Sequence, residues 1–153
     1  MIIKNKEKLK RIIDSAKKSG KPVLIKKGVF DIIHLGHIYS IKRFTQTADI
    51  TIIWVQSDKL TKVRKGSSRP INNQKSRLEV VDSIKGVDYV YPDKSNSREE
   101  YINFLNYLGP TIVAITKIDS KKTKAYSGLY WKLKEFPDKE LLGYSTTSMI
   151  NKN

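Results

Sequence analysis

The feature that most constrains the fold is the alternation of short apolar runs with segments of helical periodicity. Leu9, Ile12, Ile13 and Ala16 have the spacing of an amphipathic helix over about residues 6–19, and Gly20 ends it. Apolar runs predict strands at Val23–Lys27, Ile50–Gln56, Val87–Tyr91, Thr111–Thr116 and Leu141–Tyr144. Further helices are expected at about His37–Thr47, Asn73–Lys85, Ser97–Leu108 and Ser120–Phe136. This order predicts an α/β fold with a parallel five-stranded sheet covered by helices on both faces.

Several polar residues directly follow predicted strands. His34 follows the first strand, Asp58 the second, Lys117 the fourth and Ser145 the last. Ligands of parallel α/β sheets bind beyond the carboxyl ends of the strands, where the strand order switches. We therefore expect these four residues to lie along one edge of the sheet.

The chain has two histidines, and both lie in one short motif. His34 and His37 occur in Gly28-Val-Phe-Asp-Ile-Ile-His-Leu-Gly-His37, between the first strand and the next helix. Imidazoles can donate hydrogen bonds to charged oxygens, Gly36 permits close approach of the backbone, and a helix N-terminus attracts anions. The arrangement predicts a site for a nucleoside triphosphate.

Three sequence blocks resemble one enzyme family. G-x-F-D-x-x-H-x-G-H is similar to the signature of the cytidylyltransferase-like nucleotidyltransferases, which have a Rossmann-like fold. The stretch from Gln56-Ser-Asp58 through Lys65-Gly66 and Arg69-Pro70 to Arg77 resembles the adenylyltransferase half of the bacterial ADP-heptose synthases. Gly143-Tyr-Ser-Thr-Thr-Ser-Met-Ile150 is similar to a third block of the same enzymes. The blocks follow the family order and span nearly the whole chain.

The resemblance implies a role for each motif residue. His34, His37 and Lys65 would be catalytic. The two histidines would contact the triphosphate and stabilise the transition state, and Lys65 would stabilise the negative charge on the group being transferred. Mg²⁺ is the expected cofactor, held by phosphate oxygens and water rather than by a protein metal site. The residues expected to bind the nucleotide are Val29, Phe30, Gly36, Arg77, Ser145, Thr146 and Thr147, and those expected to bind the second substrate are Asp58, Lys62, Arg64 and Lys117.

The implied reaction transfers AMP to a phosphorylated sugar or alcohol and releases pyrophosphate. CMP transfer to a phosphorylated polyol or amino alcohol is the alternative, and Glu140, where cytidylyltransferases have arginine, favours ATP over CTP. Two departures from the heptose enzymes leave the acceptor open. Lys26-Lys27 replaces their Thr-Asn, and Ala114-Ile-Thr-Lys-Ile-Asp119 replaces their K-G-G-D-Y block.

Composition limits the remaining possibilities. With 153 residues and 39% hydrophobic side chains, one domain over 1–153 is expected. The absence of cysteine suits a reducing cytoplasm. The first residues, Met-Ile-Ile-Lys-Asn-Lys, lack the apolar region expected of a signal peptide, and no apolar run is long enough to span a membrane. We expect a cytoplasmic protein whose partners are a nucleoside triphosphate, a phosphorylated small molecule and, as in related enzymes, a second copy of the chain.

The net charge of +15 raises nucleic acid as an alternative partner. Residues 4–27 hold ten Lys or Arg against Glu7 and Asp14, and residues 59–78 hold seven and no acid. The second segment is predicted to be a phosphate-binding loop. Because no aromatic residues alternate with the N-terminal lysines, nucleic-acid binding is not favoured. A third alternative is a fragment of an enzyme like an aminoacyl-tRNA synthetase, because His-Leu-Gly-His is similar to the signature of that superfamily. The chain is too short for such an enzyme.

Overall fold

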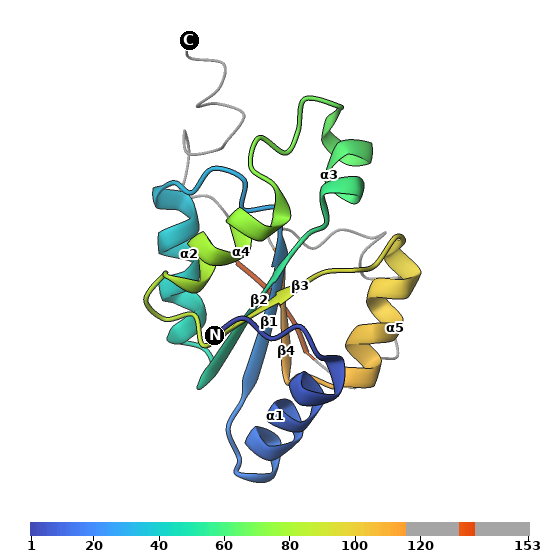
Figure 1. Ribbon diagram of the computed structural model, residues 1–153. Helices are drawn as coiled ribbons and strands as arrows, with labels where there is room; N and C mark the ends of the chain where they lie inside the picture. Colours follow the sequence, from blue (N-terminus) through green and yellow to red (C-terminus); the bar gives the residue numbers. More distant parts are fainter. Residues whose placement is uncertain (116–131, 137–153) are drawn as a thin grey trace.

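The computed structural model describes residues 1–115 and 132–136, and these contain one parallel sheet (Figure 1). Its strand order is β3-β2-β1-β4-β5. Each pair of neighbours is parallel. The predicted Rossmann-like parallel five-stranded sheet is therefore confirmed. The strands are β1 Val23–Gly28, β2 Ile50–Val55, β3 Tyr89–Pro92, β4 Ile112–Ile115 and β5 Lys132–Glu135.

Helices cover both faces of this sheet (Figure 1). Helix α1 (Lys6–Lys18) and α5 (Arg98–Leu108) share one hydrophobic core with Ile25 and Trp54 of the sheet. Helix α2 (Leu35–Thr45) and α4 (Gln74–Asp82) share a second core with Leu24 and Ile53 on the other face. Because successive residues of a strand point to opposite faces, β1 contributes to both cores.

The helices begin where local capping residues predict. Asn5 accepts a hydrogen bond from the Lys8 amide at 2.7 Å at the start of α1. Asn73 does the same for α4, and the Ser97 hydroxyl accepts from Glu100 N at 3.1 Å at the start of α5. Such caps satisfy amides that would otherwise lack a partner in the first turn.

The predicted phosphate-binding loop after β2 is wrong in part, because Asp58–Lys65 forms helix α3. The Ser57 hydroxyl caps this helix by accepting from Leu60 N at 3.2 Å, and Gly66 ends it with φ of 95°. Lys62, Arg64 and Lys65 occupy its last turn, where positive charge is favourable. Ser57 and Gly66 are local start and stop signals that the basic composition obscured.

The helix expected over about Ser120–Phe136 is also wrong at its end. Lys132–Glu135 is strand β5, which pairs in parallel with β4 and leaves Leu133 against the first core. Only Leu133 and Phe136 mark this segment as apolar, and the other residues of the strand are charged. Since β4 supplies the pairing, local periodicity does not reveal the strand. The predicted strand Leu141–Tyr144 lies outside the described residues.

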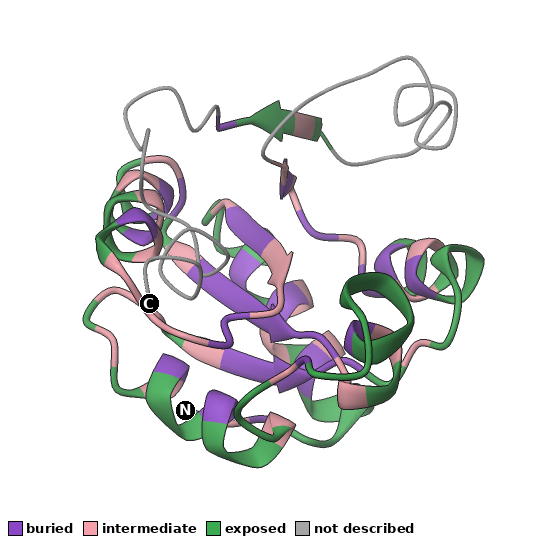
Figure 2. Cartoon of the chain, turned by 90° about the horizontal axis from the view of Figure 1, so that it is seen from above, coloured by how far each residue is buried: buried purple, intermediate pink, exposed green. Residues whose placement is uncertain are grey.

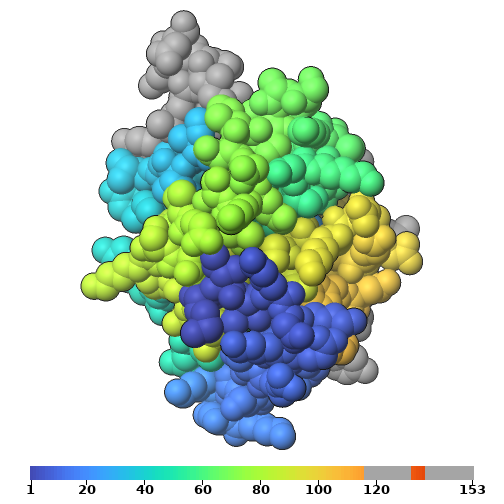
Figure 3. Space-filling view, viewed as in Figure 1, coloured from blue at the N-terminus to red at the C-terminus, as the bar shows by residue number. Residues whose placement is uncertain are grey.

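The most buried residues run through the middle of the molecule, along the central strands (Figure 2). Ile25 of β1 and Trp54 of β2 have no exposed surface. Viewed as in Figure 3, α3 and the segment after it form one end of the molecule, and α1 lies toward the other. The lysines of α1 and the basic residues of α3 therefore lie at opposite ends of the described part of the fold.

Candidate functional site

The two histidines lie where β1 passes into α2. The helix begins at Leu35, two residues before the predicted start, and His34 is its N-cap with extended backbone. The backbone N–H of His37 donates to the carbonyl oxygen of His34 at 2.9 Å. The two imidazole rings are 3.9 Å apart between centroids. The predicted position of the two histidines at a helix N-terminus is confirmed, and their contact with a triphosphate stays a prediction.

His37 is held as a neutral imidazole at neutral pH. Its pKa is lowered to about 4, first by burial and then by the positive charges of His34, Lys26 and Lys65. Within the described part of the chain, its Nδ1 atom is buried and has no hydrogen-bond partner. A neutral imidazole still carries one N–H donor. The surroundings of His37 are therefore cationic, as an anion-binding site requires.

Phe30 supports His37 from the core side. Phe30 is 5% exposed, and its ring centroid lies 5.1 Å from that of His37. Its φ of 53° is rare for a residue with a side chain. A Cβ atom on Gly28 would lie 2.6 Å from Phe30 Cε2, so Gly28 leaves room for the ring. The G-x-F part of the motif thus positions the second histidine.

Arg77 joins three segments at this edge of the sheet. It is 1% exposed, and its guanidinium donates to the carbonyl oxygens of Val29, Asn72 (2.9 Å) and Gln56 (2.8 Å). It also donates to Oδ1 of Asp58 at 2.6 Å. These bonds connect the ends of β1 and β2 with the start of α3. The sequence predicted that Arg77 and Val29 bind the nucleotide and that Asp58 binds the second substrate. In the structure Arg77 contacts both Val29 and Asp58 and so organises this edge of the sheet. Binding of the nucleotide and the second substrate stays a prediction.

Asp31 and Arg69 form a buried clamp that sequence reasoning did not single out. Arg69 Nε donates to Asp31 Oδ2 at 2.6 Å, and the Asp31 side chain has no exposed surface. The amides of Ile71 and Asn72 donate to the same carboxylate at 3.0 and 2.9 Å. Burial alone would raise the pKa of Asp31, but the Asn72, Ile71 and Arg69 hydrogen bonds outweigh it and lower the pKa. The Asp of G-x-F-D and the Arg before Pro70 were the available signals.

The basic residues of α3 lie at the same edge. Lys65 ends the helix, and its pKa is lowered by burial and by Arg69 and Arg64, against the opposite effect of Asp31. Arg64 Nη1 donates to Gln56 Oε1 at 2.7 Å, whereas Lys62 is exposed on the helix surface. Lys65 therefore belongs to the charged surroundings of His37, as its predicted catalytic role requires.

A second ion pair at this edge escaped the sequence interpretation. Lys27 Nζ lies 2.5 Å from Asp93 Oδ2 and donates to Ser95 Oγ at 3.1 Å. The same ammonium lies 4.3 Å from the ring centroid of Tyr101. Burial lowers the pKa of Lys27, and Asp93 acts in the opposite direction. The pair fixes the segment that follows β3 to the end of β1.

Four predicted site residues lie outside the described residues, namely Lys117, Ser145, Thr146 and Thr147. Gly36 lies buried in the first turn of α2, between the two histidines in the chain. Residues 1–115 and 132–136 contain no group of three or more His, Cys, Asp or Glu that could hold a metal ion. Among the same residues, no helix is long and apolar enough to cross a membrane.

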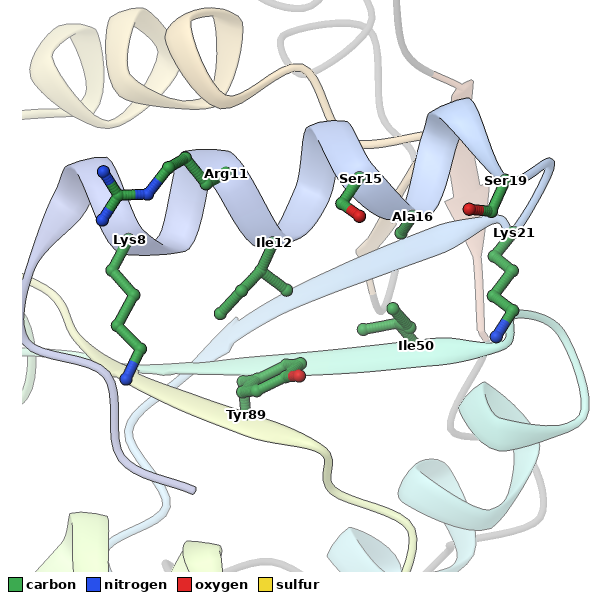
Figure 4. A pocket seen from close by; sticks show the side chains of 9 residues that line it. All are labelled: Lys8, Arg11, Ile12, Ser15, Ala16, Ser19, Lys21, Ile50 and Tyr89. Atoms are coloured by element: carbon green, nitrogen blue, oxygen red, sulfur yellow. The ribbon is translucent and has the colours of Figure 1, made fainter.

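A groove of about 520 Å³ lies beside α1, away from the histidines (Figure 4). Ile12 of α1 and Ile50 and Tyr89 of the sheet line it, with Lys8 and Lys21 toward its two ends. Ile50 and Tyr89 begin β2 and β3, so the groove lies near the amino ends of those strands. The N-terminal basic surface is thus separate from the carboxyl edge that holds His34 and His37.

Comparison with known proteins agrees with this geometry. The cytidylyltransferase-like family model matches residues 25–151. The bifunctional protein HldE of Salmonella arizonae is 35% identical over 100 residues, which are 65% of this chain and 21% of that protein. HldE of Shigella flexneri is 34% identical over a stretch of the same length. The chain therefore spans about a fifth of the length of these relatives.

Solved structures show the same fold. A lipopolysaccharide core biosynthesis protein from Thermoplasma volcanium is 25% identical with a TM-score of 0.61, covering 76% of this chain and 99% of that one. Pantoate-beta-alanine ligase from Francisella tularensis has a TM-score of 0.67 at 14% identity, covering 100% of this chain and 73% of its own, and this likeness concerns the fold alone. With the family model covering both histidines, the chain belongs to the cytidylyltransferase-like family and is on that ground a nucleotidyltransferase.

Proposed function

We propose that the chain transfers AMP, in preference to CMP, from a nucleoside triphosphate to a phosphorylated sugar or alcohol. A phosphate oxygen of the acceptor attacks the α-phosphorus, the bond from that phosphorus to the bridging oxygen breaks, and pyrophosphate leaves. The acceptor oxygen is already ionised, so the reaction needs positioning and charge stabilisation more than proton transfer. The observation that carries the proposal is the close pair of His34 and His37 rings at the start of α2, near the positive charges of Lys26 and Lys65.

Each part of the site has a role in this reaction. Neutral His37 would donate to a phosphate oxygen, with His34 beside it on the same helix N-terminus. Lys65 would stabilise the negative charge that develops on the transferring phosphoryl group. Arg77 and the Asp31 clamp would hold the loop after β1 and the start of α3 in fixed positions relative to each other. Rigid supporting contacts of this kind hold reactive groups in productive geometry.

The site fits Mg²⁺ that arrives with the nucleotide. Two carboxylates at this edge of the sheet are already paired: Asp31, within the histidine motif, with Arg69, and Asp58, at the start of α3, with Arg77. Among the described residues there is no acidic cluster to hold a cation alone. Mg²⁺ on the triphosphate would neutralise phosphate charge, and its ligands would be phosphate oxygens and water.

The preference for AMP follows from the sequence, in which Glu140 replaces the arginine of cytidylyltransferases. The resemblance of the sequence blocks to the ADP-heptose synthases favours a phosphorylated sugar as acceptor, and one of the similar solved structures is that of a lipopolysaccharide core biosynthesis protein. Thermal unfolding with Mg²⁺ and millimolar ATP or CTP tests the donor, because a bound ligand raises the melting temperature. We expect a larger rise with ATP, and a larger rise with CTP would establish the cytidylyltransferase alternative.

Pyrophosphate release then tests the acceptor class. Phosphorylated sugars, phosphorylated polyols and phosphorylated amino alcohols are each supplied with the preferred nucleotide. We expect release with a sugar phosphate. A protein that binds neither ATP nor CTP but binds an oligonucleotide would instead be a nucleic-acid-binding module on this fold.

A further inference from the structure

The end of β1 carries two adjacent lysines that point to opposite faces of the sheet. Lys27 shares its face with Ile25 and contacts Tyr101 of α5 and the Asp93 carboxylate. Its charge is therefore paired, and its role is structural. Alternation along the strand puts Lys26 on the other face, with Leu24.

That other face is the one that α2 and α4 cover. Lys26 pairs in register with Ile53 of β2 and Ala114 of β4, and both belong to the core that contains Phe30. Phe30 in turn contacts the His37 ring. Lys26 is only partly buried, and its positive charge is one of those that act on His37. These relationships place Lys26 on the same face of the sheet as Phe30, which contacts His37.

Lys26 also lies at the point where the sheet reverses its order. The chain runs from β1 to β2 and β3 on one side and then returns to β4 on the other side of β1. Ligands of such sheets bind in the crevice beyond this switch point. Lys26 is two residues from the end of β1, between β2 and β4. No other residue of the described strands β1, β2 and β4 combines a positive side chain with this face.

We infer that Lys26 is a further phosphate-binding residue, whose ammonium group holds the phosphate chain of the nucleotide from the sheet side. The inference rests on the proposed function. Lys26 and Lys65 both act to lower the pKa of His37, so their positive charges act at the histidine site. The negative phosphates of a nucleoside triphosphate would be attracted by the same charges. Lys26 would thus add a phosphate contact from a position at which the ADP-heptose synthases have threonine.

The test removes the charge and keeps the length of the side chain. Calorimetric titration of Lys26→Met with Mg²⁺ and ATP is compared with the wild type, and the same is done with AMP. We expect a loss of roughly tenfold or more in ATP affinity, as for a hydrogen bond between charged groups, and a much smaller loss for AMP. Proton NMR of the His37 ring should show its pKa rising from about 4 toward its ordinary value. Lys59→Met, on the exposed side of α3, is the matched control and should change neither quantity.

Unchanged ATP affinity in Lys26→Met would overturn the inference, even if the His37 pKa rose. An equal loss for AMP and ATP would also overturn it, because the phosphate chain would not be the contact. Should Lys26→Met fail to fold, Lys26→Thr takes its place, and Lys26→Arg should retain most of the ATP affinity. If the wild type binds neither ATP nor CTP, the proposed function is wrong. If the wild type binds ATP and Lys26→Met binds it equally well, only the role inferred for Lys26 is wrong.

Discussion

The Phe30 ring fills the space that Gly28 leaves by having no side chain, and the same ring supports the imidazole of His37. A Cβ atom at Gly28 would approach Phe30 Cε2 to 2.6 Å, and the Phe30 and His37 ring centroids are 5.1 Å apart. The end of β1 is therefore coupled to a catalytic candidate through one aromatic side chain.

Gly28→Ala should displace the Phe30 ring and, with it, His37. Overpacking of this kind costs about 1–3 kcal/mol of stability, and we expect turnover to fall as well. Urea unfolding and a pyrophosphate-release assay measure the two effects. Gly28→Ala combined with Phe30→Leu should recover part of the lost stability, because leucine vacates the contact. A double variant whose losses are simply additive would show that the two residues are not coupled.

His37→Ala should reduce turnover by roughly 10²-fold or more, as when one donor to a developing negative charge is removed. The melting temperature should change little, because the Phe30 ring remains packed in the core. Turnover and a circular dichroism melt give the two values. Full activity in the variant, or a protein that no longer folds, would assign His37 a structural role instead.

The pKa of His37 predicts how stability depends on pH. Its folded-state pKa of about 4 lies below the ordinary value of 6.5, so the unfolded chain binds more protons between these values. Stability contributed by the neutral form is present above pH 6.5 and is lost as the pH falls toward 4. Urea unfolding of the wild type should show this loss, with a slope of at most about 1.4 kcal/mol per pH unit. His37→Gln should show a shallower slope, and an equal slope would contradict the lowered pKa.

Asp31→Asn should be strongly destabilising, because it leaves the buried Arg69 guanidinium without its anionic partner. Breaking one side of a buried ion pair costs about 3–5 kcal/mol. The control is Asp14→Asn, whose partner Lys10 lies one helical turn away on α1 and whose carboxylate is 42% exposed. Exposed pairs contribute about 0–1 kcal/mol, so chemical denaturation should separate the two variants. Similar losses in both would mean that the Asp31 clamp does not stabilise the loop.

Lys65→Ala should lower kcat and kcat/KM together, the result of losing an interaction made mainly in the transition state. Lys8→Ala should leave both unchanged, because Lys8 lines the groove beside α1 rather than the histidine site. Steady-state kinetics on both variants measures the difference. A rise in KM alone for Lys65→Ala would make Lys65 a ground-state binder, and a comparable effect of Lys8→Ala would point to a polyanionic partner on the α1 surface.

The sequence determined the elements whose signals are local. Val23–Gly28 is a strand because its apolar run is bounded by Pro22 and the glycine at its end, and α2 follows it as the motif predicts. The position of His34 and His37 at one helix start also follows from neighbouring residues alone. Helix α3 also had local signals, because Ser57 caps its start and Gly66 ends it. The many basic residues of this segment led instead to the prediction of a phosphate-binding loop.

Only the tertiary structure decided the contacts that organise the carboxyl edge of the sheet. Asp31 and Arg69 are 38 positions apart, Arg77 and Val29 are 48, and Lys27 and Ser95 are 68. A buried charge is stable only beside a partner, and no local pattern identifies a partner so distant in the chain. Strand β5 is a strand for the same reason, because Lys132–Glu135 acquires its hydrogen-bond partners from β4 and not from its own sequence. Periodicity thus determined where the chain turns from strand to helix, and packing determined which charges meet at the carboxyl edge of the sheet.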